Sequence, residues 1–377
     1  MSVGTRLFWH KRLFDIESTE GLFLRAITEN VLHHQAKCLQ YAEILKSRGF
    51  SPDMLKSPED LHKIPPLPTL YLKRHSLFSV NEKKLMFKST TSGTSGKVSS
   101  MGFDWTSSFR GLGMVWRTFS SNRLLSLRPT NYIVLGYQPA KRNKIGAVKT
   151  AYATTYAAPA LHREFALRDT GSEYALNLDG IRHALIRYEK QGHPVRMMGF
   201  PAYFMFLLKG LRDHGIKVKL HHKSLIMLAG GWKQFFTERI EKPELYALSE
   251  EVLGVGESRI REFFGAVEHP ICYFDCPNHR FHVPIYSRVI IRDPFTLEPI
   301  GLGSPGLLNL LTPMVTSMPY TSVMTDDLAA LHPGEECGCG IKSPFIELFG
   351  RVGMADIKTC AAGAAELLTD TLKGAGS

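Results

Sequence analysis

The segment with the clearest chemical content is a glycine-rich run, TTSGTSGK. Glycine tolerates unusual dihedral angles and close backbone approach, so several amide N–H groups can converge on phosphate oxygens. The hydroxyl groups and the final lysine add donors and a positive charge. Only Thr94 and Ser95 separate its two glycines, too few for a Walker A loop, and a flexible surface loop is the alternative. We predict a phosphate-binding loop formed by Thr90, Thr91, Ser92, Gly93, Thr94, Ser95, Gly96 and Lys97.

Two short motifs contain residues that could bind a metal. Cys276 and His282 lie in CPNHRFH, and Cys337 and Cys339 lie in ECGCG. Three thiolates and one imidazole make a tetrahedral structural zinc site. His279 is an alternative nitrogen ligand, and the alternative to the whole site is a group of residues that binds no metal.

The chain has six cysteines in all. In a reducing compartment they favour metal binding or catalysis over disulfides. We expect Cys38 and Cys272 to lie in the core. Taken alone, Cys360 is interpreted as a small apolar residue at the start of a helix.

The elements that must position these residues follow from the apolar pattern. Residues 1–62 are predicted to be helical, and the proline-rich run Ile64–Pro68 breaks that pattern. From about residue 84 to 310, short apolar runs alternate with helical patterns. Such alternation is typical of an α/β architecture with a largely parallel sheet. The predicted strands include Asn131–Gly136, Val195–Gly199, Leu225–Ala229 and Ser287–Ile291.

Composition excludes several classes of protein. The formal net charge is +11, but the basic residues are scattered and not interleaved with aromatics, so we interpret them as solvated surface and expect no nucleic-acid partner. No apolar run approaches the roughly 20 residues of a membrane-spanning helix. Residues 1–14 lack the apolar stretch of a secretory signal. We therefore expect a cytoplasmic protein without a transmembrane segment.

Further motifs follow the glycine-rich loop in order. AGGWK spans Ala229–Lys233, FGAVE spans Phe264–Glu268, TDDL spans Thr325–Leu328, and Gly350-Arg351 comes last. Each is weak alone, but together they resemble the adenylate-forming superfamily of acyl-CoA synthetases, phenylacetate–CoA ligases and luciferases. The resemblance implies an adenylate-forming large domain with mixed sheets flanked by helices, a β-rich subdomain and a truncated C-terminal lid.

The resemblance also implies ATP and Mg²⁺ as cofactors and gives the motifs roles. The ring of Phe264 would stack on adenine, and Asp327 would bind the ribose hydroxyls. Glu268 would hold Mg²⁺, which suits a carboxylate, although Val267 stands where the family has threonine. Arg351 marks the hinge to the lid. The implied nucleotide-binding residues after the loop are Gly230, Gly231, Phe264, Gly265, Asp327 and Arg351.

Most of the chain is more similar to one branch, the acyl-protein synthetases of bacterial bioluminescence, which are long-chain-fatty-acid–protein ligases. The similarity includes GFPAYF at Gly199–Phe204, DPFTLEP at Asp293–Pro299 and KTCA at Lys358–Ala361. In that family the cysteine of the last motif accepts the acyl group, and Cys360 falls there. The cysteines of the zinc motif depart from this branch, whereas phenylacetate–CoA ligases show a similar arrangement.

The chain divides into three predicted parts. Residues 1–62 form a helical N-terminal segment, and residues 63–349 form the adenylation domain, whose β-rich part begins near residue 285. Residues 350–377 form a short arm that carries Cys360. Only 27 residues follow Gly350 (377 minus 350), so the usual lid is missing and the arm could bring its own thiol to the site.

These observations predict an acid–thiol ligase acting on a carboxylic acid, with a fatty acid favoured. ATP would convert the acid to an acyl-adenylate, with Lys97, Glu268 and Mg²⁺ stabilising the phosphates. The Cys360 thiolate would then take the acyl group, and Lys358 could lower the pKa of that thiol. The family implies a partner that reduces the acyl-protein or acyl-CoA. The alternatives are an acyl- or aryl-CoA ligase, for which CoA is the acceptor, and a non-catalytic scaffold subunit.

Overall fold

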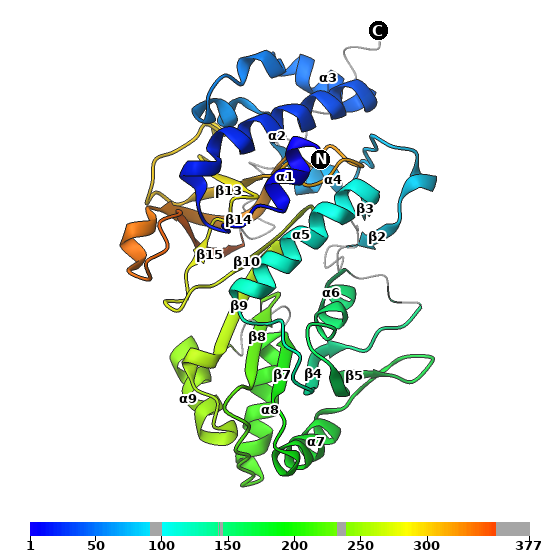
Figure 1. Ribbon diagram of the computed structural model, residues 1–377, viewed down its shortest axis with the longest axis vertical. Helices are drawn as coiled ribbons and strands as arrows, with labels where there is room; N and C mark the ends of the chain where they lie inside the picture. The colour runs from blue at the N-terminus through cyan, green and yellow to red at the C-terminus, as the bar shows by residue number, and fades with distance from the viewer. Residues whose placement is uncertain (91–99, 142, 144–145, 232–238, 352–377) are drawn as a thin grey trace. The chain divides into compact units, whose positions relative to one another are not determined.

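The computed structural model describes residues 1–90, 100–141, 143, 146–231 and 239–351 (Figure 1). These residues fall into two compact units, and the chain passes between them more than once. The first unit comprises Met1–Thr118, Gly265–Tyr273 and the chain from Arg280 onward, and the second comprises Phe119–Phe264 and Phe274–His279.

Helices begin the first unit, as the sequence predicts for its first 62 residues. The longest, α2, starts where the Asp15 carboxylate accepts a hydrogen bond from the Ser18 amide, which satisfies one of the free N–H groups of the first turn. It buries Phe23, Ile27 and Val31, whose spacing of four places them on one face. The helical elements are α1 (Val3–Phe8), α2 (Ile16–Lys37), α3 (Leu39–Ser47), the 3₁₀ turns η1 (Pro52–Met54) and η2 (Pro58–Lys63), and α4 (Thr69–Leu72).

A six-stranded sheet forms the centre of the first unit. Its strand order is β11-β15-β14-β13-β12, and the short β1 pairs parallel with β14. The other pairings are antiparallel. The strands are β1 (Leu67–Pro68), β11 (Phe281–His282), β12 (Arg288–Arg292), β13 (Gly306–Leu311), β14 (Ser322–His332) and β15 (Phe345–Arg351).

The first unit also contains a small antiparallel pair followed by a long helix. β2 (Phe87–Thr90) pairs with β3 (Ser100–Phe103), and Thr90 lies opposite Ser100. Helix α5 (Trp105–Ser121) follows β3. The predicted phosphate loop therefore begins at the end of β2, and its residues 91–97 lie outside the described part of the chain.

A seven-stranded sheet in the order β10-β9-β8-β7-β4-β5-β6 supplies the centre of the second unit, although most of β10 belongs to the first. The strands from β9 to β5 are parallel neighbours, and β6 is antiparallel to β5. The strands are β4 (Thr130–Tyr137), β5 (Ala160–Asp169), β6 (Tyr174–Leu176), β7 (Val195–Gly199), β8 (Leu225–Ala229), β9 (Ile260–Ala266) and β10 (His269–Phe274).

Helices connect these strands and complete the core. Aliphatic and aromatic side chains of α7, α8 and α9 pack with those of β4, β7 and β8 in one buried cluster. Gly199 at the end of β7 has φ +136°, and a Cβ there would collide with the Leu135 carbonyl, so the neighbouring strands require glycine at this position. The helices are α6 (Gly146–Thr154), α7 (Leu178–Gln191), α8 (Pro201–Asp213) and α9 (Lys242–Leu253).

The predicted strands are confirmed closely. β7 and β8 have the predicted bounds, β4 extends the predicted strand by one residue at each end, and β12 is shifted by one residue. Buried runs bounded by glycine are typical of parallel strands, and the α/β architecture is confirmed. Among the described helices, none is both long enough and apolar enough to cross a bilayer.

Candidate functional site

The strand pair β14–β15 places two predicted nucleotide-binding residues side by side. Asp327 and Arg351 lie directly opposite each other in the ladder, and Arg351 Nε donates a hydrogen bond to Asp327 Oδ1 at 3.1 Å. The Asp327 residue is only 8% exposed. Its carboxylate is therefore held in a fixed direction by a charge-assisted bond.

Several carboxylates act on the Arg351 guanidinium. Desolvation lowers its pKa, but the charges of Asp327, Asp326 and Glu268 together raise the pKa above its ordinary value. An acidic group that stabilises a cation in this way also favours Mg²⁺ or another positive group. Asp327, Glu268 and Arg351, which lie far apart in the sequence, thus share one electrostatic environment.

The two aspartates of the TDDL motif have different surroundings. Thr69 Oγ1 donates to Asp326 Oδ1 at 3.2 Å, and Lys73 Nζ lies 3.8 Å from Asp326 Oδ2. Successive residues of a strand point to opposite faces, so Asp326 faces helix α4 while Asp327 faces Arg351. The sequence identified Asp327 by its register but gave no signal for the contacts of Asp326, because their partners lie in a distant segment.

Glu268 occupies the short turn between β9 and β10 and is 4% exposed. The negative charge of Glu268 acts on Tyr320. Burial, and after it this charge, raises the pKa of the Tyr320 hydroxyl. Within the described ranges, no hydrogen bond or ion pair of the Glu268 carboxylate is found. A buried carboxylate without such a partner is costly, which fits a side chain that binds a cation.

The predicted adenine-pocket residues lie in and beside the second unit's sheet. Gly230 and Gly231 follow β8 with φ values of +79° and +64°, a backbone conformation that favours glycine. In the parallel β8–β9 pair Ala229 lies opposite Phe263, so Phe264 comes one residue later on β9. Gly265 follows, where a Cβ would come within 3.1 Å of the Ile271 carbonyl oxygen. The carboxyl ends of parallel strands are where nucleotides bind in open α/β sheets.

Two predicted segments of the site lie outside the described part of the chain. Thr91, Ser92, Gly93, Thr94, Ser95, Gly96 and Lys97 of the loop lie outside the described residues, as do Lys358 and Cys360 of the arm.

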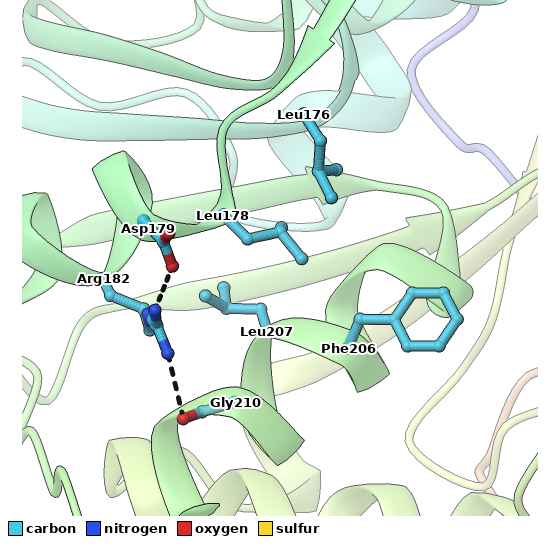
Figure 2. A pocket seen from close by; sticks show the side chains of 7 residues that line it. All are labelled: Leu176, Leu178, Asp179, Arg182, Phe206, Leu207 and Gly210. Carbon is cyan, nitrogen blue, oxygen red and sulfur yellow. Dashed lines mark hydrogen bonds and ion pairs between the residues drawn. The ribbon is translucent and has the colours of Figure 1, made fainter. Parts of the chain in front are cut away.

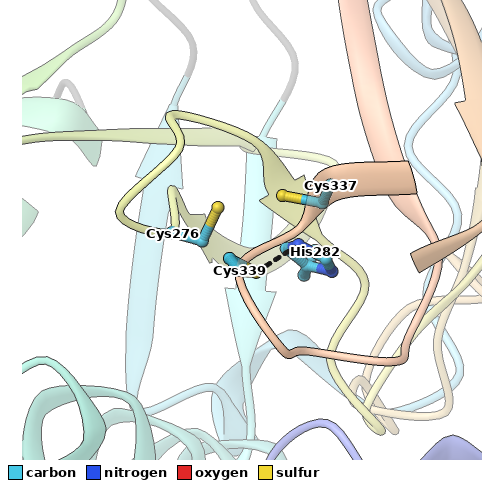
Figure 3. Close-up of side chains that lie close together, drawn as sticks. All are labelled: Cys276, His282, Cys337 and Cys339. Carbon is cyan, nitrogen blue, oxygen red and sulfur yellow. Dashed lines mark hydrogen bonds between the residues drawn. The ribbon is translucent and has the colours of Figure 1, made fainter. Parts of the chain in front are cut away.

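The four predicted zinc ligands come together. Their ligand atoms all lie within 4.8 Å of one another (Figure 3). Cys276 follows β10 and His282 ends β11, whereas Cys337 and Cys339 come from the turn between β14 and β15. Gly338 and Gly340 have φ values of +70° and +87°, which lets this turn bring both thiols to the same point.

The His282 ring is oriented as a metal ligand requires. Its Nδ1 donates to the Ser343 carbonyl at 2.7 Å, which leaves the Nε2 lone pair free to face the thiols. Cys339 Sγ lies 3.2 Å from that Nε2. Metal-bound histidines commonly donate their other N–H to a carbonyl in this way. The donor set and its geometry therefore fit a tetrahedral metal.

His279, the alternative ligand, has other partners. Its Nδ1 lies 2.6 Å from Asp275 Oδ2, and its Nε2 lies 3.2 Å from Glu257 Oε1. It has φ +54°, which turns the chain between the cysteine and the ligating histidine. The structure therefore favours His282 as the nitrogen ligand, because the His279 ring is hydrogen-bonded to Asp275 and lies beside Glu257.

A small cavity lies between α7 and α8 in the second unit (Figure 2). Leu178, Phe206 and Leu207 give it apolar walls, and Arg182 at its edge is paired with Asp179. Its volume is about 230 Å³, smaller than the roughly 300–1,000 Å³ of typical ligand sites. We therefore do not assign the acyl chain to this cavity.

Comparison with known proteins agrees with these features. The family model of the acyl-protein synthetase LuxE matches residues 12–369. The chain is 25% identical over 321 residues to the long-chain-fatty-acid–luciferin-component ligase of Vibrio harveyi, covering 82% of this chain and 80% of the relative. It is 25% identical over 338 residues to the protein of the same name from Aliivibrio fischeri, covering 84% and 82%.

Solved structures show the same fold. The chain resembles an open conformation of 2-hydroxyisobutyryl-CoA ligase in complex with 2-HIB-AMP and CoA, with a TM-score of 0.66 and 16% identity. The likeness covers 90% of this chain and 77% of that structure, and it confirms the predicted adenylate-forming fold. Since the family model spans nearly all of the sequence, the protein belongs to the acyl-protein synthetase LuxE family and is a ligase.

Proposed function

We propose that this protein activates a fatty acid as acyl-AMP and then transfers the acyl group to its own Cys360. The observation that carries the proposal is the pairing of Asp327 with Arg351 beside Glu268. Those three residues belong to separate motifs predicted from a resemblance to adenylate-forming enzymes. Family membership supports the same chemistry.

In the first half-reaction, the substrate carboxylate attacks the α-phosphorus of ATP and pyrophosphate leaves. Asp327 accepts hydrogen bonds from the ribose hydroxyls, and Lys97 with the loop amides neutralises the leaving phosphates. Glu268 would hold Mg²⁺, which would supply Lewis-acid stabilisation of the phosphate charge. Gly230, Gly231 and Phe264 enclose the adenine.

In the second half-reaction, the Cys360 thiolate attacks the carbonyl carbon of the acyl-adenylate. A carbon–sulfur bond forms, the bond from that carbon to the AMP oxygen breaks, and AMP leaves. Lys358 lies two residues away in the sequence and favours the thiolate by its charge. The arm of residues 350–377 delivers the thiol. It follows the proposed adenylation domain of residues 63–349, which in turn follows the helical segment of residues 1–62.

The substrate and partner follow from the relatives' names. The relatives from Vibrio harveyi and Aliivibrio fischeri are named long-chain-fatty-acid–luciferin-component ligases, so we assign a long-chain fatty acid to this protein as well. A thioester formed in this way serves as an acyl donor to a reductase, which is the proposed partner. The cytoplasm is the proposed location, because Cys38, Cys272 and Cys339 form no disulfide and this suits a reducing compartment.

We also propose a structural zinc ion at Cys276, His282, Cys337 and Cys339. Three thiols and an imidazole within 4.8 Å of one another support this choice, because soft thiolates with tetrahedral geometry select zinc. The ion would fix the β14–β15 turn against β11 and take no part in acyl transfer.

The experiment that tests the proposal is incubation with ATP, Mg²⁺ and a panel of radiolabelled fatty and aromatic acids. Hydroxylamine-sensitive label on the protein, lost in Cys360→Ala while ATP–pyrophosphate exchange persists, is the expected result. Release of acyl-CoA without protein label would instead make the enzyme a CoA ligase. Failure of every acid to support ATP–pyrophosphate exchange would favour a scaffold subunit.

A further inference from the structure

A buried hydrogen-bond chain begins at His269, the residue that follows Glu268. The side chains of His269, Tyr273 and Ser287 are all fully buried. His269 Nε2 lies 2.9 Å from the Tyr273 hydroxyl and 3.2 Å from Ser287 Oγ, and these two oxygens are 2.6 Å apart. Ser287 Oγ donates to the Leu311 carbonyl at 3.0 Å. The chain therefore links the first residue of β10 to the end of β13, within the first unit.

The direction of each bond in this chain follows from the groups that can donate. A carbonyl oxygen only accepts, so the Ser287 hydroxyl proton points at Leu311. Because the serine oxygen has no second proton, Tyr273 donates to it and His269 Nε2–H donates to Tyr273. Burial lowers the pKa of His269 to about 3, so the ring is neutral and has one N–H group. The bonds thus run in one direction from the imidazole to the sheet, and each strengthens the next.

Glu268 depends on its neighbours for its direction. The turn between β9 and β10 consists of Val267 and Glu268 alone. The Glu268 carboxylate is buried and has no hydrogen-bond partner among the described residues, so no bond of its own fixes its position. Consecutive Cα atoms are only about 3.8 Å apart. Anchoring of the His269 side chain therefore restrains the peptide group that joins it to Glu268.

The hydrogen-bond chain ends in the sheet that carries the Asp327–Arg351 pair. Leu311 is the last residue of β13 and lies opposite Ser322, the first residue of β14. Asp327 lies further along β14, where it faces Arg351 of β15. Glu268 and the Asp327–Arg351 pair are thus tied to the same strands. Metal ligands are commonly oriented by such outer partners, and loss of one typically lowers metal affinity about 10–100-fold.

We propose that His269 is a positioning residue, which holds Glu268 toward the Mg²⁺ of a bound nucleotide through its hydrogen bonds to Tyr273 and Ser287. This inference rests on the proposed function, in which Glu268 is the Mg²⁺ ligand. His269 Nε2 is engaged by the two hydroxyls, so the ring acts through the backbone of the turn and not on the nucleotide. A chain that only satisfies buried polar groups would affect stability alone, whereas a positioning chain affects the contribution of Mg²⁺ to nucleotide binding.

The test is isothermal titration calorimetry of the full-length protein with α,β-methylene-ATP, once in Mg²⁺ and once in EDTA. This analogue resists cleavage at the bond that adenylation breaks, so binding is measured without turnover. Mg²⁺ should strengthen binding to the unaltered protein, and Glu268→Gln should abolish that gain. Ser287→Ala should weaken binding about 10-fold in Mg²⁺ and leave binding in EDTA unchanged. Ser249→Ala is the matched control, because Ser249 is also fully buried and donates to the Val255 carbonyl at 2.8 Å. It should bind as the unaltered protein does under both conditions.

Substitutions of His269 itself supply a second test. His269→Leu should lose the gain from Mg²⁺, whereas His269→Gln keeps an N–H donor at a similar reach and should retain most of it. Unchanged binding by Ser287→Ala in Mg²⁺, or equal weakening with and without Mg²⁺, would overturn the proposal, because the chain would then be only structural. Nucleotide binding by the unaltered protein that does not respond to Mg²⁺ would instead contradict the proposed role of Glu268, and the inference with it.

Discussion

The two ends of the β14–β15 strand pair carry different kinds of site. At one end Asp327 lies opposite Arg351, and at the other His332 lies opposite Phe345, beyond which the chain turns through Cys337 and Cys339. The metal end is enclosed, because Cys276, His282 and Cys337 are 5%, 1% and 9% exposed. At the nucleotide end Arg351 is exposed.

Under the proposed function, this difference separates a structural site from a catalytic one. At the metal end each donor is turned toward the others, and a backbone carbonyl fixes the histidine. At the nucleotide end a buried acid, Glu268, lies near the Asp327–Arg351 pair without a hydrogen-bond partner among the described residues. Donors that face one another suit a permanent ion, whereas a buried charge without a hydrogen-bond partner, such as Glu268, suits a ligand that binds and leaves.

The largest expected effect comes from breaking the metal end. Cys339→Ser should lower zinc affinity by more than about 100-fold, since loss of a mere outer-shell partner costs 10–100-fold. It should also lower the melting temperature. Metal analysis of the purified protein and calorimetry measure both changes.

Cys272→Ser is the matched control, because Cys272 is a free cysteine outside the cluster. It should leave the metal content unchanged. If the unaltered protein holds no zinc after dialysis against zinc-free buffer, the metal end is only a thiol cluster.

Substitutions at the nucleotide end should have the next largest effect. Asp327→Ala removes charge-assisted hydrogen bonds to ATP, each worth about 1.5–3 kcal/mol, so the KM for ATP in pyrophosphate exchange should rise about 100-fold. Its neighbour provides the control, because Asp326 bonds to Thr69 and Lys73. Asp326→Ala should change that KM by no more than about threefold and cost roughly 1 kcal/mol of stability. Equal kinetic effects of the two variants would contradict the assignment.

The smallest expected effect is on the pH dependence of stability, through a histidine that packs against the sheet of the first unit. His34 is fully buried, and its Nε2 bonds to the Val315 carbonyl in the β13–β14 connection. Burial, and to a lesser extent the charge of His33, lowers the pKa of His34 from 6.5 to about 3. The unfolded chain therefore binds a proton that the folded chain does not, between pH 6.5 and about 3. The contribution of neutral His34 to the free energy of unfolding is fully present above pH 6.5 and is lost as the pH falls toward 3.

Denaturant unfolding at several pH values measures this effect. Acidification from pH 6.5 to 5 should cost about 2 kcal/mol through His34, and His34→Gln should remove that part of the pH dependence. His222→Gln, at an exposed histidine, should leave the dependence as it is in the unaltered protein. An unchanged slope in His34→Gln would show that His34 is charged when folded.

The sequence predicted one part of the nucleotide end and most of the metal end. Asp327 was identifiable because the TDDL motif has a fixed register. The thiols of Cys337 and Cys339 come together by their short spacing, whereas Cys276 lies in a distant part of the sequence. The choice between His279 and His282 stayed open, because the Ser343 carbonyl that orients His282 lies 61 residues away. Periodicity located β7 and β8, since buried parallel strands leave continuous apolar runs.

The buried face of α5 could not be predicted in the same way. Its helical pattern does not say which side faces the protein, and the bond that decides this joins Arg110 to Pro313, 203 residues away. An apolar stripe would ordinarily be assigned to the core. Only tertiary contacts show that the buried side combines Ser107 and Arg110 with Met114 and Phe119.

The central claim is that one chain both forms the acyl-adenylate and accepts its acyl group. Peptide mass spectrometry of the protein after incubation with ATP, Mg²⁺ and a long-chain fatty acid tests it most directly. The account predicts the acyl mass on the peptide containing Cys360, removable by hydroxylamine and absent without ATP. An acyl group on another residue, or an unmodified protein that nevertheless consumes ATP and the acid, would contradict it.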